Sequence, residues 1–141
     1  MRTTSRPDLA GHLRHTIVRV ARRLRQEAGG ELSPSLTAAL STVERHGPLT
    51  PSELASRERI QRPTATRVLA RLEEEGLIER TADLYDRRSS LVAATTKGSE
   101  LLEELRTRKT AFLAARLETL TPEERATLEQ AADILERVLE R

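Results

Sequence analysis

The sequence predicts a mainly α-helical protein with one small β-hairpin, an α+β fold class. Apolar residues recur at steps of three and four along most of the 141 residues, which is the spacing of an amphipathic helix. The spacing changes after Gly76, where two short β-type runs flank a polar segment. A chain of this length is expected to form a single domain, 1–141.

The first helix is expected over residues 9–26 and ends at Gly29-Gly30. Three later helices are predicted at 34–46, 51–57 and 122–139, because each start places a hydroxyl side chain directly before a proline. The hydroxyl accepts an unpaired backbone N–H, and proline has no N–H to leave unpaired in the first turn. These pairs are Ser33-Pro34, Thr50-Pro51 and Thr121-Pro122.

A further helix is predicted from Arg62 or Pro63 to Glu75, with Gly76 as its C-cap and one buried side made by Val68, Leu69 and Leu72. Two strands follow, at 77–81 and 90–95, and residues 83–89 form the hairpin loop between them. A long helix from Lys97 to Leu120 precedes the last one.

This order of elements predicts a winged helix-turn-helix over residues 33–96, in which two short helices are followed by a hairpin, the wing. The outer helices, 9–30 and 97–141, carry apolar stripes that the predicted fold leaves uncovered. We therefore expect N- and C-terminal dimerisation helices.

Composition excludes several classes of protein. The chain has no cysteine, so disulfides, thiolate metal sites and thiol redox sensing are excluded. Neither a signal peptide nor an apolar run of roughly 18 residues is visible, and we expect a cytoplasmic protein that does not enter the membrane. Tyr85 and Phe112 are the only aromatic residues, which disfavours a stacking surface for single-stranded nucleic acid.

Charge is segregated along the predicted helix-turn-helix. Five arginines but only one acid, Glu58, lie between residues 57 and 71, whereas residues 73–75 are all glutamate. In a helix-turn-helix the second helix enters the major groove of DNA with its N-terminus first, so a basic front and an acidic rear suit DNA binding. The alternative is an ordinary solvated helix face.

The candidate base-contacting face carries Thr64, Arg67 and Arg71, at helical steps of three and four. The loop arginines are candidates for the neighbouring minor groove, although the loop's acids nearly offset them. The full set of expected DNA-binding residues is Thr50, Ser52, Gln61, Arg62, Pro63, Thr64, Thr66, Arg67, Arg71, Asp86, Arg87 and Arg88.

The chain resembles the MarR family of bacterial transcriptional regulators. The similar residues are the helix 64–73, Gly76-Leu77-Ile78-Glu79-Arg80, the wing Asp86-Arg87-Arg88-Ser89 and Thr95-Thr96-Lys97-Gly98. The resemblance implies a homodimer on a pseudo-palindromic duplex, with recognition helices in successive major grooves and wings in the minor grooves. It also implies repression that a small lipophilic or aromatic effector relieves by binding between the dimerisation and DNA-binding regions.

His12 and His15, three residues apart on the first helix, are candidates for contact with such an effector. A zinc site would need about three protein ligands, and no partner motif accompanies them, so we expect no metal and no cofactor. The sequence also lacks a nucleophile–base pair and a glycine-rich phosphate loop, so we do not expect an enzyme. The alternative to a DNA-binding regulator is a winged-helix module that binds another protein and no DNA.

Overall fold

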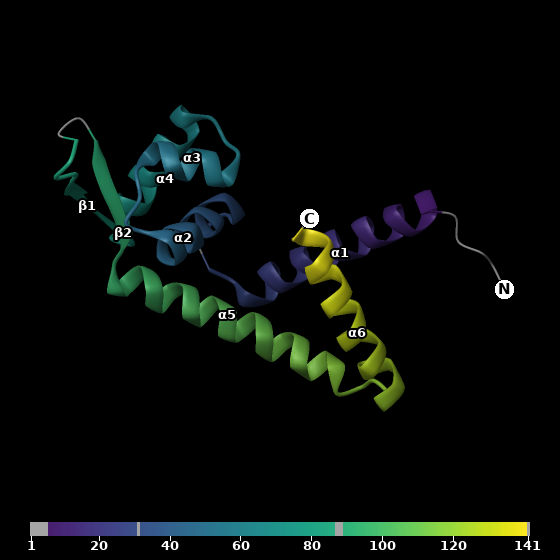
Figure 1. Ribbon diagram of the computed structural model, residues 1–141. Helices are drawn as coiled ribbons and strands as arrows, with labels where there is room; N and C mark the ends of the chain where they lie inside the picture. The colour runs from purple at the N-terminus through teal and green to yellow at the C-terminus, as the bar shows by residue number, and fades with distance from the viewer. Residues whose placement is uncertain (1–5, 31, 87–88, 141) are drawn as a thin grey trace. The chain divides into compact units, whose positions relative to one another are not determined.

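The computed structural model describes residues 6–30, 32–86 and 89–140 of the chain. The described part is mainly helical with one antiparallel hairpin, as predicted (Figure 1). Its elements are α1 (Arg6–Ala28), α2 (Pro34–His46), α3 (Pro51–Glu58), α4 (Arg62–Glu74), β1 (Ile78–Ala82), β2 (Ser90–Ala94), α5 (Thr96–Leu117) and α6 (Pro122–Leu139).

Two predicted helix ends differ from the structure by three residues, the start of α1 and the end of α5. α1 begins at Arg6, three residues before the apolar stripe, because a first turn with a proline and Asp8 suits a helix N-terminus without any apolar residue. α5 ends at Leu117 rather than at Leu120, and the intervening residues form a turn in which the N–H of Leu120 donates to the carbonyl oxygen of Leu117 at 3.1 Å.

The chain forms two compact units, residues 28–107 and residues 1–27 together with 108–141. The first contains α2, α3, α4 and the hairpin with the beginning of α5. The second contains α1, α6 and the remainder of α5.

The core of unit 28–107 draws one apolar side from every helix and strand in it. α4 contributes Ala65, Leu69 and Leu72, all fully buried, whereas Val68 is only partly buried at the margin of the core. The predicted buried side of α4 is thus correct for Leu69 and Leu72, and Val68 packs against the core while only partly buried. Ala65 is a central member that the prediction omitted. The other fully buried large side chains are Leu40, Val43, Leu49, Leu54, Leu77 and Val92.

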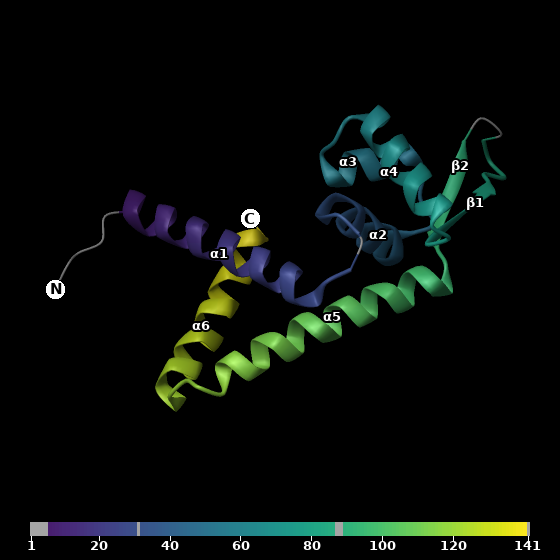
Figure 2. The ribbon, with the colours of Figure 1, turned by 180° about the vertical axis from the view of Figure 1, so that it is seen from behind.

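The second strand of the hairpin is hydrogen-bonded to the connection between α2 and α3. In the β1–β2 ladder, Ile78 lies opposite Ala94 and Arg80 opposite Val92. On its other side, Val92 pairs with Leu49, with N···O distances of 2.8 and 3.0 Å for the two hydrogen bonds. The connection between α2 and α3 therefore acts as a third, one-residue strand, and it holds the hairpin beside the helix-turn-helix (Figure 2).

A polar junction joins the end of α4 to the start of α5. The Thr95 hydroxyl donates to the carbonyl oxygen of Gly76 at 2.7 Å and accepts from the N–H of Gly98 at 3.1 Å. The Lys97 ammonium donates to the carbonyl oxygen of Glu75 at 2.8 Å. Gly98 is buried so closely that a Cβ atom there would lie 2.2 Å from the carbonyl oxygen of Leu77. The Thr95 hydroxyl is therefore used at this junction as both a donor and an acceptor, and Gly98 leaves the space that the Leu77 carbonyl occupies.

The second unit is different, because no side chain among its described residues is buried. The α1 stripe is exposed, with Ile17 at 46% and Leu13 at 39% of full exposure, and α6 exposes Leu128 and Ile134 to a similar degree. Phe112 is its only aromatic residue in the described part, and the guanidinium carbons of Arg23 and Arg116 lie 5.6 and 5.1 Å from the ring centroid. The apolar periodicity of α1 and α6 is therefore not explained by packing within one chain.

We expect Gly98→Ala to lower the free energy of unfolding by about 1–3 kcal/mol, because the added methyl group overlaps backbone that cannot move independently. The matched control is Gly11→Ala in α1, where a Cβ meets nothing within 4 Å and helix propensity favours alanine. Thermal unfolding at one fixed protein concentration compares the two variants. Equal melting temperatures for Gly98→Ala and the unsubstituted protein would contradict the close contact at Leu77.

Candidate nucleic-acid interface

The helix-turn-helix begins with a capping box at Thr50, the residue predicted to precede this helix. The Thr50 hydroxyl accepts from the N–H of Glu53 at 3.2 Å, and the Glu53 carboxylate accepts from the N–H of Thr50 at 3.4 Å. These two bonds fix the start of α3, where Thr50 and the exposed Ser52 lie.

The turn between α3 and α4 is tight and is closed by backbone hydrogen bonds. Arg59 has φ 54° and ψ 44°, the left-handed conformation, and its N–H donates to the carbonyl oxygen of Ser56 at 3.3 Å. The N–H of Ile60 donates to the carbonyl oxygen of Ala55 at 3.0 Å, and the Ile60 side chain packs against the core. The direction of α4 is thereby set relative to α3.

The start of α4 is open to solvent. Gln61 is the N-cap residue but its side chain makes no capping hydrogen bond, and Pro63 in the first turn has no N–H. The Thr66 hydroxyl donates to the carbonyl oxygen of Arg62 at 3.0 Å. The positive end of the helix dipole therefore faces outward without a neutralising side-chain cap.

Most of the expected DNA-binding residues lie on the surface of this unit. Gln61, Arg62, Pro63, Thr66, Arg67, Arg71, Ser52 and Asp86 are exposed, whereas Thr50 and Thr64 are partly buried. Arg87 and Arg88 lie outside the described residues. The set omitted Arg57 and Arg59, although both are exposed in the same segment and the run of arginines was visible in the sequence.

Arg67 and Arg71 differ in their surroundings. The Nη2 atom of Arg67 lies 3.5 Å from the Thr64 hydroxyl oxygen, a long hydrogen bond between two residues of the expected base-contacting face. Arg71 instead forms an ion pair with Glu75, with Nη2 and Oε1 3.1 Å apart. Arg67 is therefore the less neutralised of the two guanidiniums.

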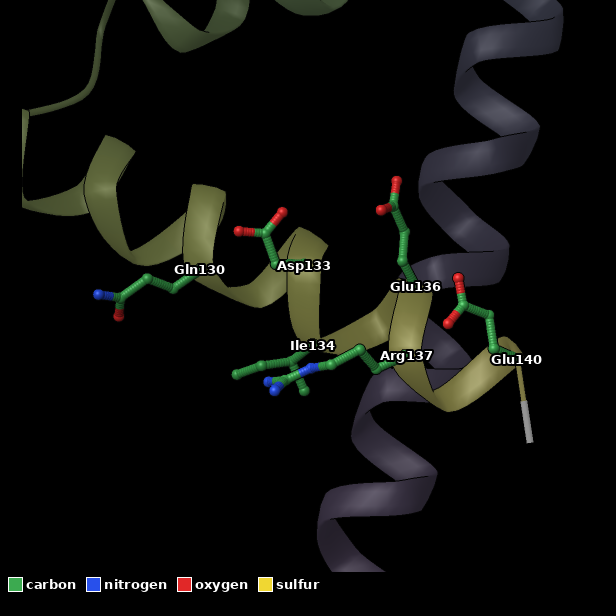
Figure 3. A pocket seen from close by; sticks show the side chains of 6 residues that line it. All are labelled: Gln130, Asp133, Ile134, Glu136, Arg137 and Glu140. Atoms are coloured by element: carbon green, nitrogen blue, oxygen red, sulfur yellow. The ribbon is translucent and has the colours of Figure 1, made fainter.

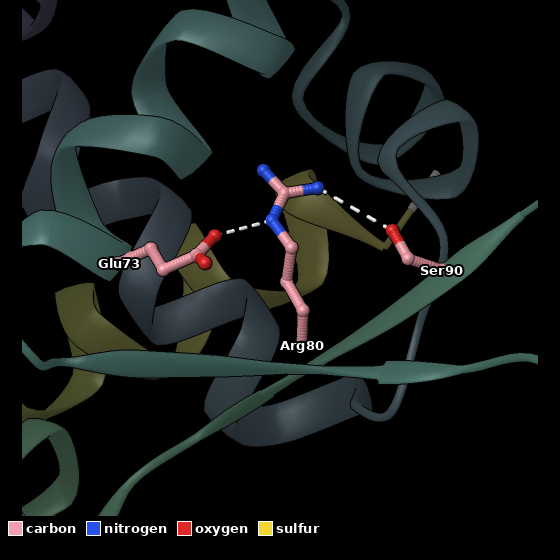
Figure 4. Close-up of polar contacts among 3 residues, drawn as sticks. All are labelled: Glu73, Arg80 and Ser90. Atoms are coloured by element: carbon pink, nitrogen blue, oxygen red, sulfur yellow. Dashed lines mark hydrogen bonds and ion pairs between the residues drawn. The ribbon is translucent and has the colours of Figure 1, made fainter.

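The acidic rear of α4 holds the hairpin. The Arg80 guanidinium of β1 forms a close ion pair with Glu73 and donates to the Ser90 hydroxyl of β2 at 3.3 Å (Figure 4). Acids near the negative end of the helix dipole are unfavourable in isolation, and the sequence indicated no partner for them. In the structure, Glu73 and Glu75 are both paired with arginines.

The one acid within the arginine-rich segment is turned toward α2. The Thr42 hydroxyl donates to the Glu58 carboxylate, and Glu58 is partly buried. Arg57 and Arg62 on either side are exposed. Glu58 forms no ion pair with these arginines within the described residues, and its single charge only partly offsets the positive charge at the α3–α4 turn.

The described part of the hairpin loop is a compact turn. The Asp83 carboxylate accepts from the N–H of Tyr85 at 2.9 Å, and the N–H of Ser89 donates to the carbonyl oxygen of Asp86 at 3.1 Å. Leu84 and Tyr85 of this loop are almost fully exposed.

The candidate effector residues, His12 and His15, are both exposed on α1. No group of three potential metal ligands occurs within residues 6–30, 32–86 and 89–140. Surface hollows among the described residues of the unit that contains α1 and α6 include one lined by α1 and one lined by α6. The hollow on α6 has the carboxylates of Asp133, Glu136 and Glu140 on one side of the helix and the side chains of Ile134 and Arg137 on another (Figure 3).

Comparisons with known proteins identify the family. The family model described as the MarR family matches residues 32–90. An HTH-type transcriptional regulator of Mycobacterium bovis is 38% identical over 128 residues, which are 90% of each chain. The chain belongs to the MarR family of helix-turn-helix transcriptional regulators. Another relative, the HTH-type transcriptional repressor MdtR of Bacillus subtilis, is 33% identical over 75% of this chain and 73% of its own length.

Solved structures show the same fold. A putative transcriptional regulator of Pseudomonas aeruginosa superposes with a TM-score of 0.84 at 34% identity, covering 94% of this MarR-family chain and 95% of its own. FabT of Streptococcus pneumoniae, solved in complex with DNA, superposes with a TM-score of 0.72 at 20% identity, covering 96% and 98%. None of the helices in the described part is long and apolar enough to cross a membrane.

We expect the ion pair between Glu73 and Arg80 to contribute about 0.5 kcal/mol to stability, because both side chains are partly exposed, at 45% and 29%. A double-mutant cycle with Glu73→Gln and Arg80→Gln measures this coupling by chemical denaturation. The coupling should shrink when the salt concentration is raised. Additive effects at low salt would show that the pair does not hold the hairpin to α4.

Proposed function

We propose that this chain is a homodimeric regulator that binds double-stranded DNA in a sequence-specific manner and represses transcription. The observation that carries the proposal is the two-sided α4, with Ala65, Leu69 and Leu72 fully buried and Arg67 and Arg71 exposed on the opposite side. A helix anchored in this way presents its arginines at a fixed angle to a groove. The DNA-bound FabT structure has the same fold.

In this proposal α4 is the recognition helix. Thr64, Arg67 and Arg71 contact base edges, and arginine is suited to guanine because its planar fork matches two acceptors. The remaining helix residues, Thr50, Ser52, Gln61, Arg62, Pro63 and Thr66, flank the groove and contact the backbone. Asp86, Arg87 and Arg88 of the wing reach the adjacent minor groove, as the family resemblance predicts.

The dimer is proposed from the uncovered apolar surface of α1 and α6. Stripes at helical spacing, such as Leu13 and Ile17 on α1, are 39% and 46% exposed in one chain. Burying such stripes against a second copy removes apolar area from water, which favours association. A dimer places two recognition helices on half-sites about one helical turn apart, and hence on a pseudo-palindromic operator.

Repression and its relief are proposed from the relatives. MdtR is named a repressor, and the resemblance to the family includes release by a small molecule. The contact of His12 and His15 with such an effector stays a prediction from the sequence. A regulator of this kind would act in the cytoplasm, where bacterial DNA is accessible.

The experiment for DNA binding is a fluorescence-anisotropy titration with a duplex that spans the promoter region of the protein's own gene. We expect Arg67→Ala to weaken binding to this duplex by about 1–3 kcal/mol per half-site, because alanine cannot form the bidentate hydrogen bonds to a base. Binding to a scrambled duplex of equal length should weaken much less.

The control for this titration is Arg137→Gln, which removes one positive charge from exposed surface on α6. If Arg67→Ala weakens the affinity for both duplexes equally, Arg67 binds a phosphate and not a base. Failure of the unsubstituted protein to distinguish its promoter from the scrambled duplex would favour a module that binds another protein.

For the dimer, we expect Ile17→Glu to shift the protein from dimer toward monomer, because a carboxylate in a buried apolar interface is strongly disfavoured. Val18→Glu is the matched control, since Val18 is also accessible, at 57% exposed, but lies on another side of α1. Sedimentation velocity at several concentrations measures the shift. A dimer that tolerates Ile17→Glu as well as Val18→Glu would place the interface elsewhere.

A further inference from the structure

Arg59 has an uncommon backbone conformation for its residue type. Its φ of 54° and ψ of 44° are left-handed, a region that glycine enters freely and that side chains with a Cβ atom disfavour. Within the described part of the chain, the other residues with positive φ are all glycines, at positions 29, 30 and 76. The turn between α3 and α4 therefore carries a conformational cost that glycine would remove.

The fold itself does not require a side chain at this position. The turn is closed by main-chain hydrogen bonds from the N–H groups of Arg59 and Ile60, at 3.3 and 3.0 Å, and its apolar contact comes from Ile60. The Arg59 side chain is exposed, and no residue in the described ranges forms an ion pair or hydrogen bond with its guanidinium. The stability of the turn thus gives no reason for arginine.

The charges around the turn supply a reason. Arg57 and Arg62 are exposed on either side, also without an ion-paired acid in the described ranges. Glu58 accepts a hydrogen bond from Thr42 and brings a single negative charge to a turn that carries three arginines, Arg57, Arg59 and Arg62. At the other end of α4 the pattern is reversed, because Arg71 and Arg80 are paired with glutamates. Net positive charge is therefore concentrated where α4 begins, next to the positive end of its dipole.

We propose that Arg59 binds a backbone phosphate of the DNA, with Arg57 beside it, and that the left-handed turn is retained for this interaction at the expense of stability. This inference rests on the proposed DNA-binding function and adds two residues to it. A residue in the turn lies off the helical face that carries Thr64, Arg67 and Arg71, so its natural partner is the phosphate chain at the groove edge rather than a base. Such an interaction positions α4 without selecting sequence.

The test is Arg59→Gly, which removes the conformational cost and the phosphate-binding side chain together. We expect its melting temperature to rise by roughly 2–5 °C, because glycine fits the left-handed turn. We expect DNA binding to weaken by roughly 5- to 30-fold, since a dimer of this variant lacks two phosphate-binding guanidiniums. The weakening should be similar for the promoter duplex and for a scrambled duplex, which separates Arg59 from a base-contacting residue such as Arg67.

The salt dependence shows whether Arg59 binds a phosphate. The slope of log Kobs against log salt should become shallower by about 0.9 for each phosphate that is no longer neutralised, and hence by about 1.8 for the dimer. Arg59→Asn, which tolerates the left-handed conformation but has no charge, should behave like Arg59→Gly. Arg59→Lys should retain most of the slope and the melting temperature of the unsubstituted protein.

Arg137→Gln is again the control for removal of one positive charge, and it should leave the slope nearly unchanged. Unchanged affinity and slope in Arg59→Gly would overturn the phosphate interaction. If Arg59→Gly binds DNA more weakly but does not melt at a higher temperature, the left-handed turn costs no stability. That result would overturn the claim that the turn is retained at the expense of stability. If the unsubstituted protein binds neither duplex, the proposed function itself fails, and this result is distinct because it is obtained before any variant is compared.

Discussion

The arrangement of the DNA-binding unit depends on the burial of one side of α4. Ala65, Leu69 and Leu72 are fully buried together with Leu54 of α3 and Val92 of β2, so α4 cannot rotate without exposing apolar surface to water. The opposite side, with Arg67 and Arg71, is consequently held outward. The position of the wing is fixed by the same core, because Val92 of β2 is buried in it and hydrogen-bonded to Leu49. One core thus orients both elements that are proposed to contact DNA.

Polar contacts distribute charge over this framework. Glu73 pairs with Arg80 of β1 and Glu75 pairs with Arg71, so the acids at the end of α4 are used within the protein. At the other end, Glu58 is hydrogen-bonded to Thr42, and its single negative charge is outnumbered by Arg57, Arg59 and Arg62, none of which forms an ion pair within the described residues. The near-zero net charge of the whole chain therefore conceals a basic surface, which is what long-range attraction of DNA requires.

The second unit has the opposite character, because its helices are regular but cover little of each other. α6 contributes no buried residue, although Thr121 and Glu124 form a complete capping box at its start and its apolar residues recur regularly. Local sequence specifies the start of this helix, and its apolar side is not buried within one chain. The contrast between the two units is what a regulator with separate binding and assembly surfaces would display.

The sequence by itself determined the order of the elements, most helix starts and the family, because caps, prolines and apolar periods act over a few residues. Ser33, Thr50 and Thr121 each begin a helix as their positions predict. Only the tertiary structure decided which glutamates are neutralised, why Gly98 must lack a side chain and that Arg59 is left-handed. These features depend on groups that are distant in sequence, such as Thr42 and Glu58, or on backbone angles that closure of the turn imposes. The residue types alone therefore located the basic surface, and packing determined which of its arginines remain free.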